Sequence, residues 1–366
     1  MVRHEVAGWG AYPDGFSRPA PELHVTIPLS ILDLAPIGEG ETPHDSLAAS
    51  VTLARRAETL GYRRIWYAEH HNIPGIASSA TSVLIAHVAA NTSTIRLGAG
   101  GIMLPNHPPL VIAEQFGTLA TLHPGRIDLG LGRAPGSDQR TMQAMRRDPR
   151  SADRFPDDVL ELQGYLGERS LVPGVEATPG KGTHVPLYVL GSSLFGAQLA
   201  AALGLPYAFA SHFAPAALEE AVRRYRADFT PSTQLETPYV IAGVNVLAAD
   251  TSELAREQLR AAERRRAHLL FGQGRPYDPA EADLLLDSPA GEQVREMLRY
   301  TVLGTGAEVV DGLERFAAHA QADELMVAPS APDRAAALHG LELLAAATPG
   351  RSPIAVRAAS SSGATA

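Results

Sequence analysis

The sequence predicts an α/β fold in which eight parallel strands and their helices close into one (β/α)8 barrel, the TIM-barrel architecture. Three observations predict it. Short β-type runs alternate with helical runs from residue 23 to residue 348, which is the pattern of parallel βα units. Eight such units follow one another without a polar linker that would divide the 366 residues into two halves. A content of 45% hydrophobic residues suits one large core.

The expected strands are short runs rich in Val, Ile, Leu and Tyr, and turn or loop residues bound each of them. The first ends at Asp33, directly before a proline-containing loop, and the second ends at Ala68, before a polar loop. The eight strands are expected at residues 24–33, 64–68, 95–100, 127–132, 186–190, 207–210, 239–248 and 324–328.

The expected helices fill the gaps between these strands. The first shows the reasoning: its apolar residues recur every three or four positions, Thr42 or Asp45 can cap its start, and Gly61 can end it. The helices are expected at residues 45–60, 80–90, 109–122, 152–166, 195–203, 216–229, 252–270 and 334–346.

Three segments depart from the βα pattern. Residues 271–315, between the last two strands, are richer in Pro, Gly and charge, and we expect an insertion that closes as a lid and carries helices at 280–286, 291–299 and 308–319. Residues 1–22 are expected to form an N-terminal extension, so that the barrel domain spans 23–348. Residues 349–366 consist largely of Ala, Ser, Pro and Gly, and we expect a tail without structure.

Composition excludes several classes of function. The chain has 31 Lys and Arg against 40 Asp and Glu, a formal charge of −9, which argues against nucleic acid or an anionic membrane as main partner. No run approaches the roughly 18 apolar residues of a membrane span, and the first 21 residues lack the apolar core of a signal peptide. The absence of Cys excludes disulfides, thiolate chemistry and Cys-ligated metals, and it indicates a cytoplasmic location.

Polar residues and glycines gather where the expected strands end. In a (β/α)8 barrel the carboxyl ends of all strands meet at one mouth, where the chemistry takes place. We therefore expect one site that contains residues from several strand ends. They are Asp33, Glu69, His70, His71, Gly100, Gly101, Gly132, Arg133, Gly191, Ser192, Ser193, Ser211 and His212.

The second strand ends in two adjacent histidines, His70 and His71. Successive side chains of a strand point to opposite faces, so only one of the two can face the barrel axis. A barrel metal site needs more ligands, and the other histidines show no ligand spacing, so we expect no metal. A general acid or base is the expected role, and a histidine that caps a loop is the structural alternative.

Glycines end the third and fourth strands. Without side chains at Gly100, Gly101 and Gly132, a planar ring can lie flat against the backbone, which predicts an aromatic cofactor. The alternative is that these glycines only allow the barrel wall to bend.

The fifth strand runs into Gly191, Ser192 and Ser193 at the start of a helix. Hydroxyl groups and free backbone N–H groups at a helix N-terminus can bind a phosphate, and Arg133 at the neighbouring strand end can supply the charge. Ordinary N-capping by one of the serines is the alternative.

A substrate pocket is expected over the loops after strands one, two, six and seven and under the insertion. These loops carry no recognisable substrate code. The residues expected to line the pocket are Ile37, Ile73, His212, Phe213 and Asn245.

The residues at these strand ends resemble the bacterial luciferase-like, or alkanal monooxygenase-like, flavin-dependent monooxygenases. The similar stretches occur in the same order as in that family and span most of residues 23–346. They are Ser30 to Ile37, Trp66 to Asn72, Arg96 to Pro109, Ala113 to Gln115, Pro124 to Gly136, Leu190 to Ser193 and Asp323 to Val327.

The resemblance implies a TIM barrel that binds FMN, usually as a reduced cosubstrate delivered by a separate NAD(P)H:flavin reductase. O2 would add to the flavin, and the resulting peroxyflavin would oxidise an aldehyde or another small organic substrate. The family also implies a homodimer formed through helices of the first half of the barrel.

By position, the resemblance makes His70 the catalytic histidine and places Glu69 beside the flavin ring, so we expect these two residues to be the catalytic ones. It assigns Arg133, Ser192 and Ser193 to the phosphate pocket, and we add Asp33, Gly100, Gly101, Gly132 and Gly191 to the cofactor site. It also implies a cis peptide between Gly100 and Gly101. Where the luciferase α chain has a reactive Cys, this chain has Gly132, which argues against light emission from a long-chain aldehyde.

Two other functions fit the same residues. A related barrel uses the deazaflavin F420 for hydride transfer without oxygen, and its ring would occupy the same slot. A flavin-binding barrel without catalytic activity is the second alternative, although such a protein would have no use for His70.

Overall fold

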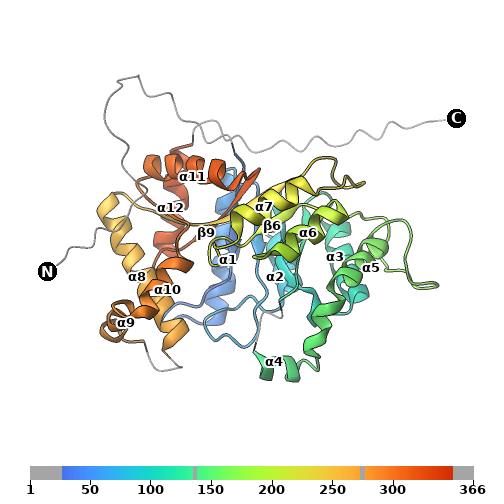
Figure 1. Ribbon diagram of the computed structural model, residues 1–366, viewed down its shortest axis with the longest axis horizontal. Helices are drawn as coiled ribbons and strands as arrows, with labels where there is room; N and C mark the ends of the chain where they lie inside the picture. Colours follow the sequence, from blue (N-terminus) through green and yellow to red (C-terminus); the bar gives the residue numbers. More distant parts are fainter. Residues whose placement is uncertain (1–26, 135–137, 273–276, 349–366) are drawn as a thin grey trace, which may run out of the picture.

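The structure is a computed structural model that describes residues 27–134, 138–272 and 277–348 (Figure 1). The predicted N-terminal extension and the predicted tail lie outside these residues, as do residues 24–26 of the first predicted strand.

The barrel predicted from the sequence is confirmed. β1 pairs with β2 and with β9, and β7 pairs with both β9 and β6, so that eight parallel strands form a closed ring. Its strands are β1 (Leu29–Asp33), β2 (Arg64–Tyr67), β3 (Arg96–Met103), β4 (Ile127–Gly132), β5 (Leu187–Gly191), β6 (Tyr207–Phe209), β7 (Val240–Ala248) and β9 (Glu324–Pro329).

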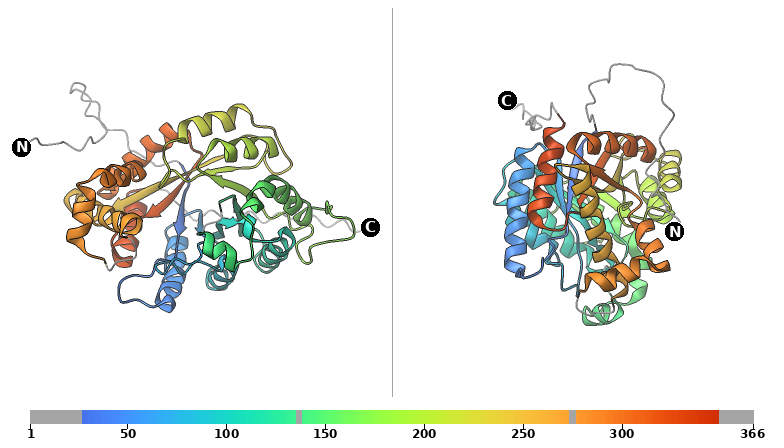
Figure 2. Two further views of the ribbon diagram at one scale, coloured as in Figure 1. Left: turned by 60° about the horizontal axis from the view of Figure 1, so that its bottom comes forward. Right: turned by 90° about the vertical axis from the view of Figure 1, so that its left-hand side faces the viewer.

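Helices surround the strands, as Figure 2 shows from two sides. The long ones are α1 (Pro43–Thr59), α2 (Thr81–Ala89), α3 (Pro109–Leu122), α5 (Phe155–Leu166), α6 (Leu194–Leu203), α7 (Leu218–Ala227), α8 (Ser252–Phe271), α11 (Gly306–Ala320) and α12 (Arg334–Ala346). Shorter elements are η1 (Leu104–Asn106), α4 (Gln139–Ala144) and η2 (Pro149–Arg154).

The predicted insertion contains an element that the sequence analysis did not predict. A short strand, β8 (Thr301–Gly304), pairs with the second half of β7, from Asn245 to Ala248. The helices α9 (Pro279–Leu286) and α10 (Pro289–Met297) agree with the first two predicted helices and share a small apolar cluster with the end of α8. The third belongs to α11, whose apolar residues join the main core, so it is a barrel helix rather than part of a lid.

Alternation along the strands divides the apolar residues into two layers. Ile65 and Tyr67 of β2 point outward into the layer between strands and helices, whereas Trp66 points into the barrel with Tyr188 of β5. The ring centroids of Trp66 and Tyr188 are 5.0 Å apart in an edge-on arrangement. The barrel interior is therefore a packed core and not a channel.

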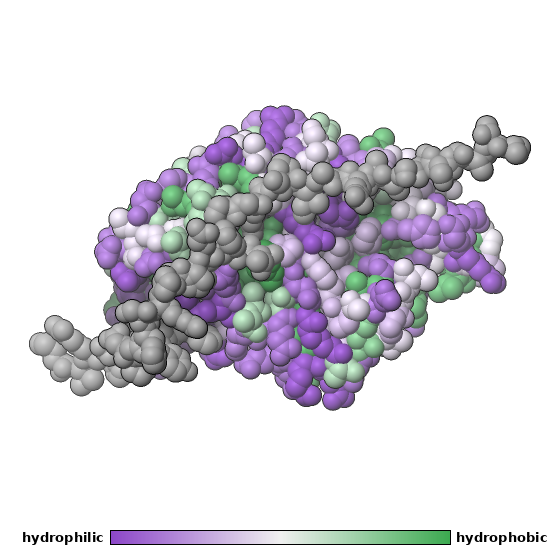
Figure 3. Space-filling view, turned by 90° about the horizontal axis from the view of Figure 1, so that it is seen from above, coloured by the Kyte–Doolittle hydropathy of each residue, from purple (hydrophilic) through white to green (hydrophobic). Residues whose placement is uncertain are grey.

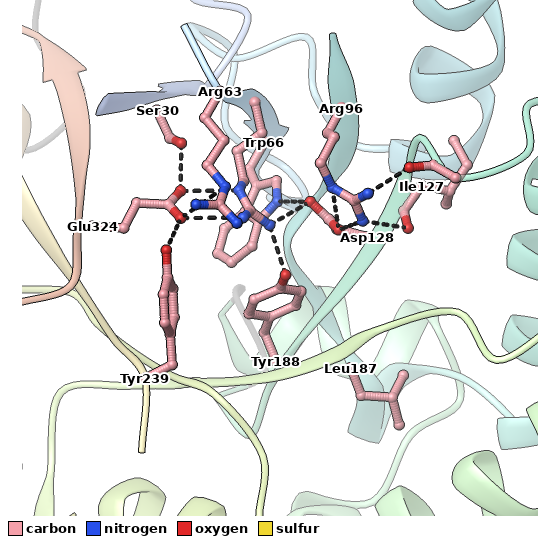
Figure 4. Close-up of polar contacts among 12 residues, drawn as sticks. Ser30, Arg63, Trp66, Arg96, Ile127, Asp128, Leu187, Tyr188, Tyr239 and Glu324 are labelled. Atoms are coloured by element: carbon pink, nitrogen blue, oxygen red, sulfur yellow. Dashed lines mark hydrogen bonds and ion pairs between the residues drawn. The ribbon is translucent and has the colours of Figure 1, made fainter. Parts of the chain in front are cut away.

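A network of charged side chains fills the end of the barrel where the strands begin, opposite the mouth (Figure 4). Arg64 is buried, and its Nη1 lies 2.7 Å from Asp128 Oδ2 and donates to the Tyr188 hydroxyl at 2.7 Å. Its Nη2 donates to Glu324 Oε2 at 3.1 Å. Burial disfavours the charged form of each group, but attraction between the opposite charges outweighs this effect. The pKa of Arg64 is therefore raised and that of Asp128 is lowered.

One face of the molecule is mainly hydrophilic (Figure 3). Figure 3 shows a face on which hydrophilic residues predominate and apolar residues lie in small patches. Within the ranges that the structure describes, none of the helices has the length and apolar character needed to cross a bilayer.

Candidate active site

Glu69 connects the loops that follow β2 and β3 at the mouth of the barrel. Its Oε1 lies 2.8 Å from His71 Nε2 and 2.9 Å from His107 Nε2, and its Oε2 accepts a hydrogen bond of 2.9 Å from the backbone N–H of Met103. Burial by itself would raise the pKa of this carboxyl, but the hydrogen bonds from His107 and His71 lower it to about 2.

A carboxylate with this pKa and these contacts stays ionised near neutral pH and has little capacity to exchange protons. The sequence analysis grouped Glu69 with His70 as catalytic. The geometry favours a positioning role, in which Glu69 holds His71 and the end of β3 in place beside the site.

His70 lies next to this cluster but takes no part in it. Its backbone N–H donates to the carbonyl of Ser78 at 3.0 Å, which fixes the main chain. Its Nδ1 is buried and has no hydrogen-bond partner among the described residues. Burial lowers the pKa of the imidazole below its ordinary 6.5, so the ring is neutral at pH 7 and able to accept a proton.

Asp33 lies at the end of β1, where its carboxylate is engaged by the protein. Oδ1 accepts a hydrogen bond of 2.7 Å from the backbone N–H of Ala35, and Oδ2 accepts one of 2.6 Å from the Ser50 hydroxyl on α1. Burial raises the pKa of Asp33. The side chain thus lies between strand and helix rather than in the barrel mouth, and its assignment to the cofactor site remains a prediction that these contacts do not support.

The glycines of β3 have a packing role. The Gly100–Gly101 peptide is cis, as expected. A Cβ at Gly100 would lie 2.8 Å from Trp66 Cβ, and one at Gly101 would lie 2.8 Å from the carbonyl oxygen of Gly130. Close contact between strands therefore requires glycine at both positions whether or not a ring binds there. The flat slot remains a prediction.

The predicted phosphate site is assembled from β4 and the start of α6. The Arg133 guanidinium stacks over the Phe195 ring, 4.3 Å from its centroid, which brings this cation to the helix N-terminus. Ser193 is the N-cap residue, but within the described part of the chain its side chain makes no capping hydrogen bond. Ordinary capping is therefore not what Ser193 does here, and its hydroxyl and the first backbone N–H groups of α6 remain available.

Gly191 differs from the glycines of β3. A Cβ at this position would meet no atom closer than 3.7 Å, which is an ordinary contact distance. Packing of the protein does not require a glycine at the end of β5. Close approach of a ligand to the backbone would explain why a glycine stands at this position.

The loop after β6, the second half of β7 and the residues that follow β9 lie together at another part of the mouth. The amide of Asn245 donates to the backbone carbonyl of His212 at 2.6 Å and accepts a hydrogen bond of 3.0 Å from the Ser330 hydroxyl. The ring of His212 stacks edge-on against Phe213, with centroids 4.9 Å apart. His212, Phe213 and Asn245 therefore lie together, as the sequence analysis expected for residues of one pocket.

Sequence reasoning missed His107 and Ser330. His107 directly follows η1 and lies in the stretch from Arg96 to Pro109 that resembles the family. Its place after β3 could therefore have identified it as a site residue. Ser330 follows the last residue of β9 and could have been found by the rule applied to the other strand ends.

The comparisons with known proteins agree with the barrel fold and show the family of the chain. The model of the luciferase-like monooxygenase family matches residues 27–324. A luciferase-like monooxygenase of Escherichia coli (strain K12) is 50% identical over 321 residues, which cover 87% of this chain and 96% of that protein. The N-acetyl-S-alkylcysteine monooxygenase of Bacillus subtilis (strain 168) is 39% identical over 251 residues, 65% of this chain and 72% of that protein. The solved structure of apo-MsnO8 has a TM-score of 0.80 at 36% identity and covers 88% of this chain and 98% of its own.

Proposed function

Because the chain belongs to the luciferase-like monooxygenase family, we propose that it is a monooxygenase that uses reduced FMN and O2 to oxidise a small organic substrate, such as an aldehyde. The observation that carries the choice of FMN is the pairing of Arg133 with the uncapped start of α6. A guanidinium beside free N–H groups at a helix N-terminus suits the phosphate of a mononucleotide.

Reduced FMN would supply the electrons and the reaction with O2, so the protein needs no nucleophile of its own. Arg133 and the α6 N-terminus would orient the cofactor. His70, with its neutral ring and unpartnered Nδ1, would move protons at the reacting centre. Glu69 would hold the neighbouring loops so that the site keeps its shape.

Oxygen uptake tests the proposed reaction. Photoreduced FMN and the protein, with a panel of aldehydes, should consume O2 and yield the corresponding carboxylic acids in proportion. Reduced F420 should support no hydride exchange under the same conditions. Hydride transfer from F420 without O2 uptake, or tight flavin binding without turnover of any aldehyde, would contradict the proposal.

Arg133→Ala is expected to weaken FMN binding by roughly 1.5–3 kcal/mol, the contribution of a hydrogen bond to a charged group. The loss arises because the side chain provides the cation at the phosphate. Fluorescence titration of FMN and anaerobic titration of reduced FMN measure the change. Arg150→Ala is a matched control, since Arg150 is an exposed arginine paired only with Asp148 in the described structure. Equal affinities of Arg133→Ala and the parent protein would remove the phosphate site.

We also propose that the protein is a homodimer and receives reduced flavin from a separate reductase. The adjacent helices α2 and α3 each expose a large apolar side chain, Val83 at 66% and Leu122 at 65%. Val83→Asp with Leu122→Asp is expected to give monomers in sedimentation velocity. Leu284→Asp, on the similarly exposed Leu284 of α9, should leave the dimer intact. A monomeric parent protein would refute this assembly.

A further inference from the structure

Three consecutive arginines on α8 have three different surroundings. Arg264 binds the carboxylate of Asp283 with two hydrogen bonds, of 2.9 and 2.7 Å. Arg265 donates to the carbonyl of Pro332 at 3.1 Å. Arg266 is half-buried, yet it has neither a hydrogen bond nor an ion pair with any residue in the ranges 27–134, 138–272 and 277–348. Burial without a compensating carboxylate lowers its pKa.

Arg266 lies at the level of the barrel mouth. The Arg265 contact fixes this turn of α8 beside Pro332, in the loop that follows the mouth end of β9. Arg266 comes eleven residues after the buried Ala255, about three helical turns later and on nearly the same face. α8 packs against β7 and β8, and the side chain of Arg266 is half-buried at this end of the helix.

His212 lies in the loop that follows β6. Its ring packs so closely on β7 that a Cβ at Gly243 would lie 2.3 Å from Nδ1. Nδ1 is buried and lacks a hydrogen-bond partner among the described side chains and backbone. Burial and the positive charge of Arg266 together lower the pKa of His212 to about 4, so the imidazole is neutral near pH 7 and adds no second charge. Hydrogen bonds also link the two neighbourhoods, because Asn245 donates to the carbonyl of His212 and accepts from Ser330, two residues before the Pro332 that binds Arg265.

We propose that Arg266 and His212 form an anion-binding subsite for the carboxylate of the organic substrate, so that the enzyme acts on small organic acids. A guanidinium that is partly removed from water without a partner is costly, and a ligand carboxylate would restore the pairing with two parallel hydrogen bonds. His212 would supply a neutral hydrogen-bonding group beside it. In the proposed function Arg133, which follows β4 and stacks on Phe195 of α6, would bind the cofactor phosphate, so the mouth would present one cation for each of two anions.

The identity of the substrate class rests on the proposed oxidation, but anion binding at Arg266 can be tested without flavin. The probes are 3-phenylpropionate and its neutral analogue 3-phenylpropanamide, titrated calorimetrically into the flavin-free protein. The parent protein should bind the carboxylate about ten-fold more tightly than the amide, the difference made by one charge-assisted pair. Arg266→Gln should bind both equally, whereas Arg264→Gln and Arg265→Gln should keep the preference.

A crystal of the parent protein soaked in sodium selenate provides a second measurement that does not depend on any variant. Anomalous density for selenate within hydrogen-bond distance of the Arg266 guanidinium is expected. The proposal would be overturned if the parent protein showed no preference for the carboxylate, or if the preference persisted in Arg266→Gln. Absence of selenate at Arg266 would overturn it as well. Selenate at Arg266 without the preference for the organic carboxylate would mean an adventitious ion only. FMN titration of the same variants should be unchanged, so a failure of flavin binding is recognised separately.

Discussion

Replacing His70 by alanine is expected to reduce turnover by about 10²–10⁴-fold while FMN binding and the fold are retained. The ring is neutral and its Nδ1 has no partner among the described residues, so its removal breaks no hydrogen bond of that atom. What is lost is a group that can move a proton next to the flavin and substrate. Oxygen uptake under saturating reduced FMN measures the change, and a flavin titration serves as the control.

The pH profile gives this prediction a second readout. Because burial lowers the pKa of His70, its neutral form should persist below pH 6.5, and the acidic limb of kcat/KM should fall below that value. This limb should disappear in His70→Ala.

His71→Ala is the matched comparison. Its Nε2 lies 2.8 Å from Glu69 Oε1, and this hydrogen bond raises the pKa of His71. We expect a smaller loss of turnover, caused by a displaced Glu69. An inactive His71→Ala beside an active His70→Ala would mean that the wrong histidine has been assigned.

Sequence periodicity predicted all eight barrel strands because each carries a full apolar run between turn residues. β8 was missed since a run of four residues, Thr301–Gly304, is too short to stand out from a loop. The same limit explains why α11 was divided between the insertion and the barrel: only packing shows that Val309 and Leu313 join the main core.

The candidate site was predictable as a set of strand ends but not as a set of contacts. The rule that chemistry lies at the carboxyl ends of barrel strands located His70, Arg133 and Ser193. It could not show that Glu69 binds His107, because the loop between them is fixed only by the fold. Nor could it separate Gly101, which close packing requires, from Gly191, which it does not.

The buried ion network at the end of the barrel where the strands begin could also not be predicted from the sequence. Arg64, Asp128 and Glu324 each look like an ordinary polar residue at the start of a strand. Only closure of the barrel brings them together, because they come from β2, β4 and β9. Their role is structural, since chemistry in this fold lies at the opposite end of the strands.

Arg64→Met is expected to lower the free energy of unfolding by roughly 3–5 kcal/mol, because it leaves Asp128 and Glu324 buried with much less compensation. Urea denaturation measures the change. Arg223→Met is the control: Arg223 pairs with Glu220 on the surface, and its loss should leave the free energy of unfolding nearly unchanged. Equal midpoints of the two variants would show that the network contributes nothing beyond a surface ion pair.

The pH dependence of this difference identifies its cause. The pKa of Asp128 is lowered in the folded protein, so its pairing stabilises the fold at every pH above the ordinary value of 3.8 and is lost as the pH falls through the lower, folded value. The gap in stability between the parent protein and Arg64→Met should therefore be constant around neutral pH and shrink in strong acid. If lost packing of the arginine side chain were the cause, the gap would persist into acid, because the apolar contacts of Arg64 do not titrate.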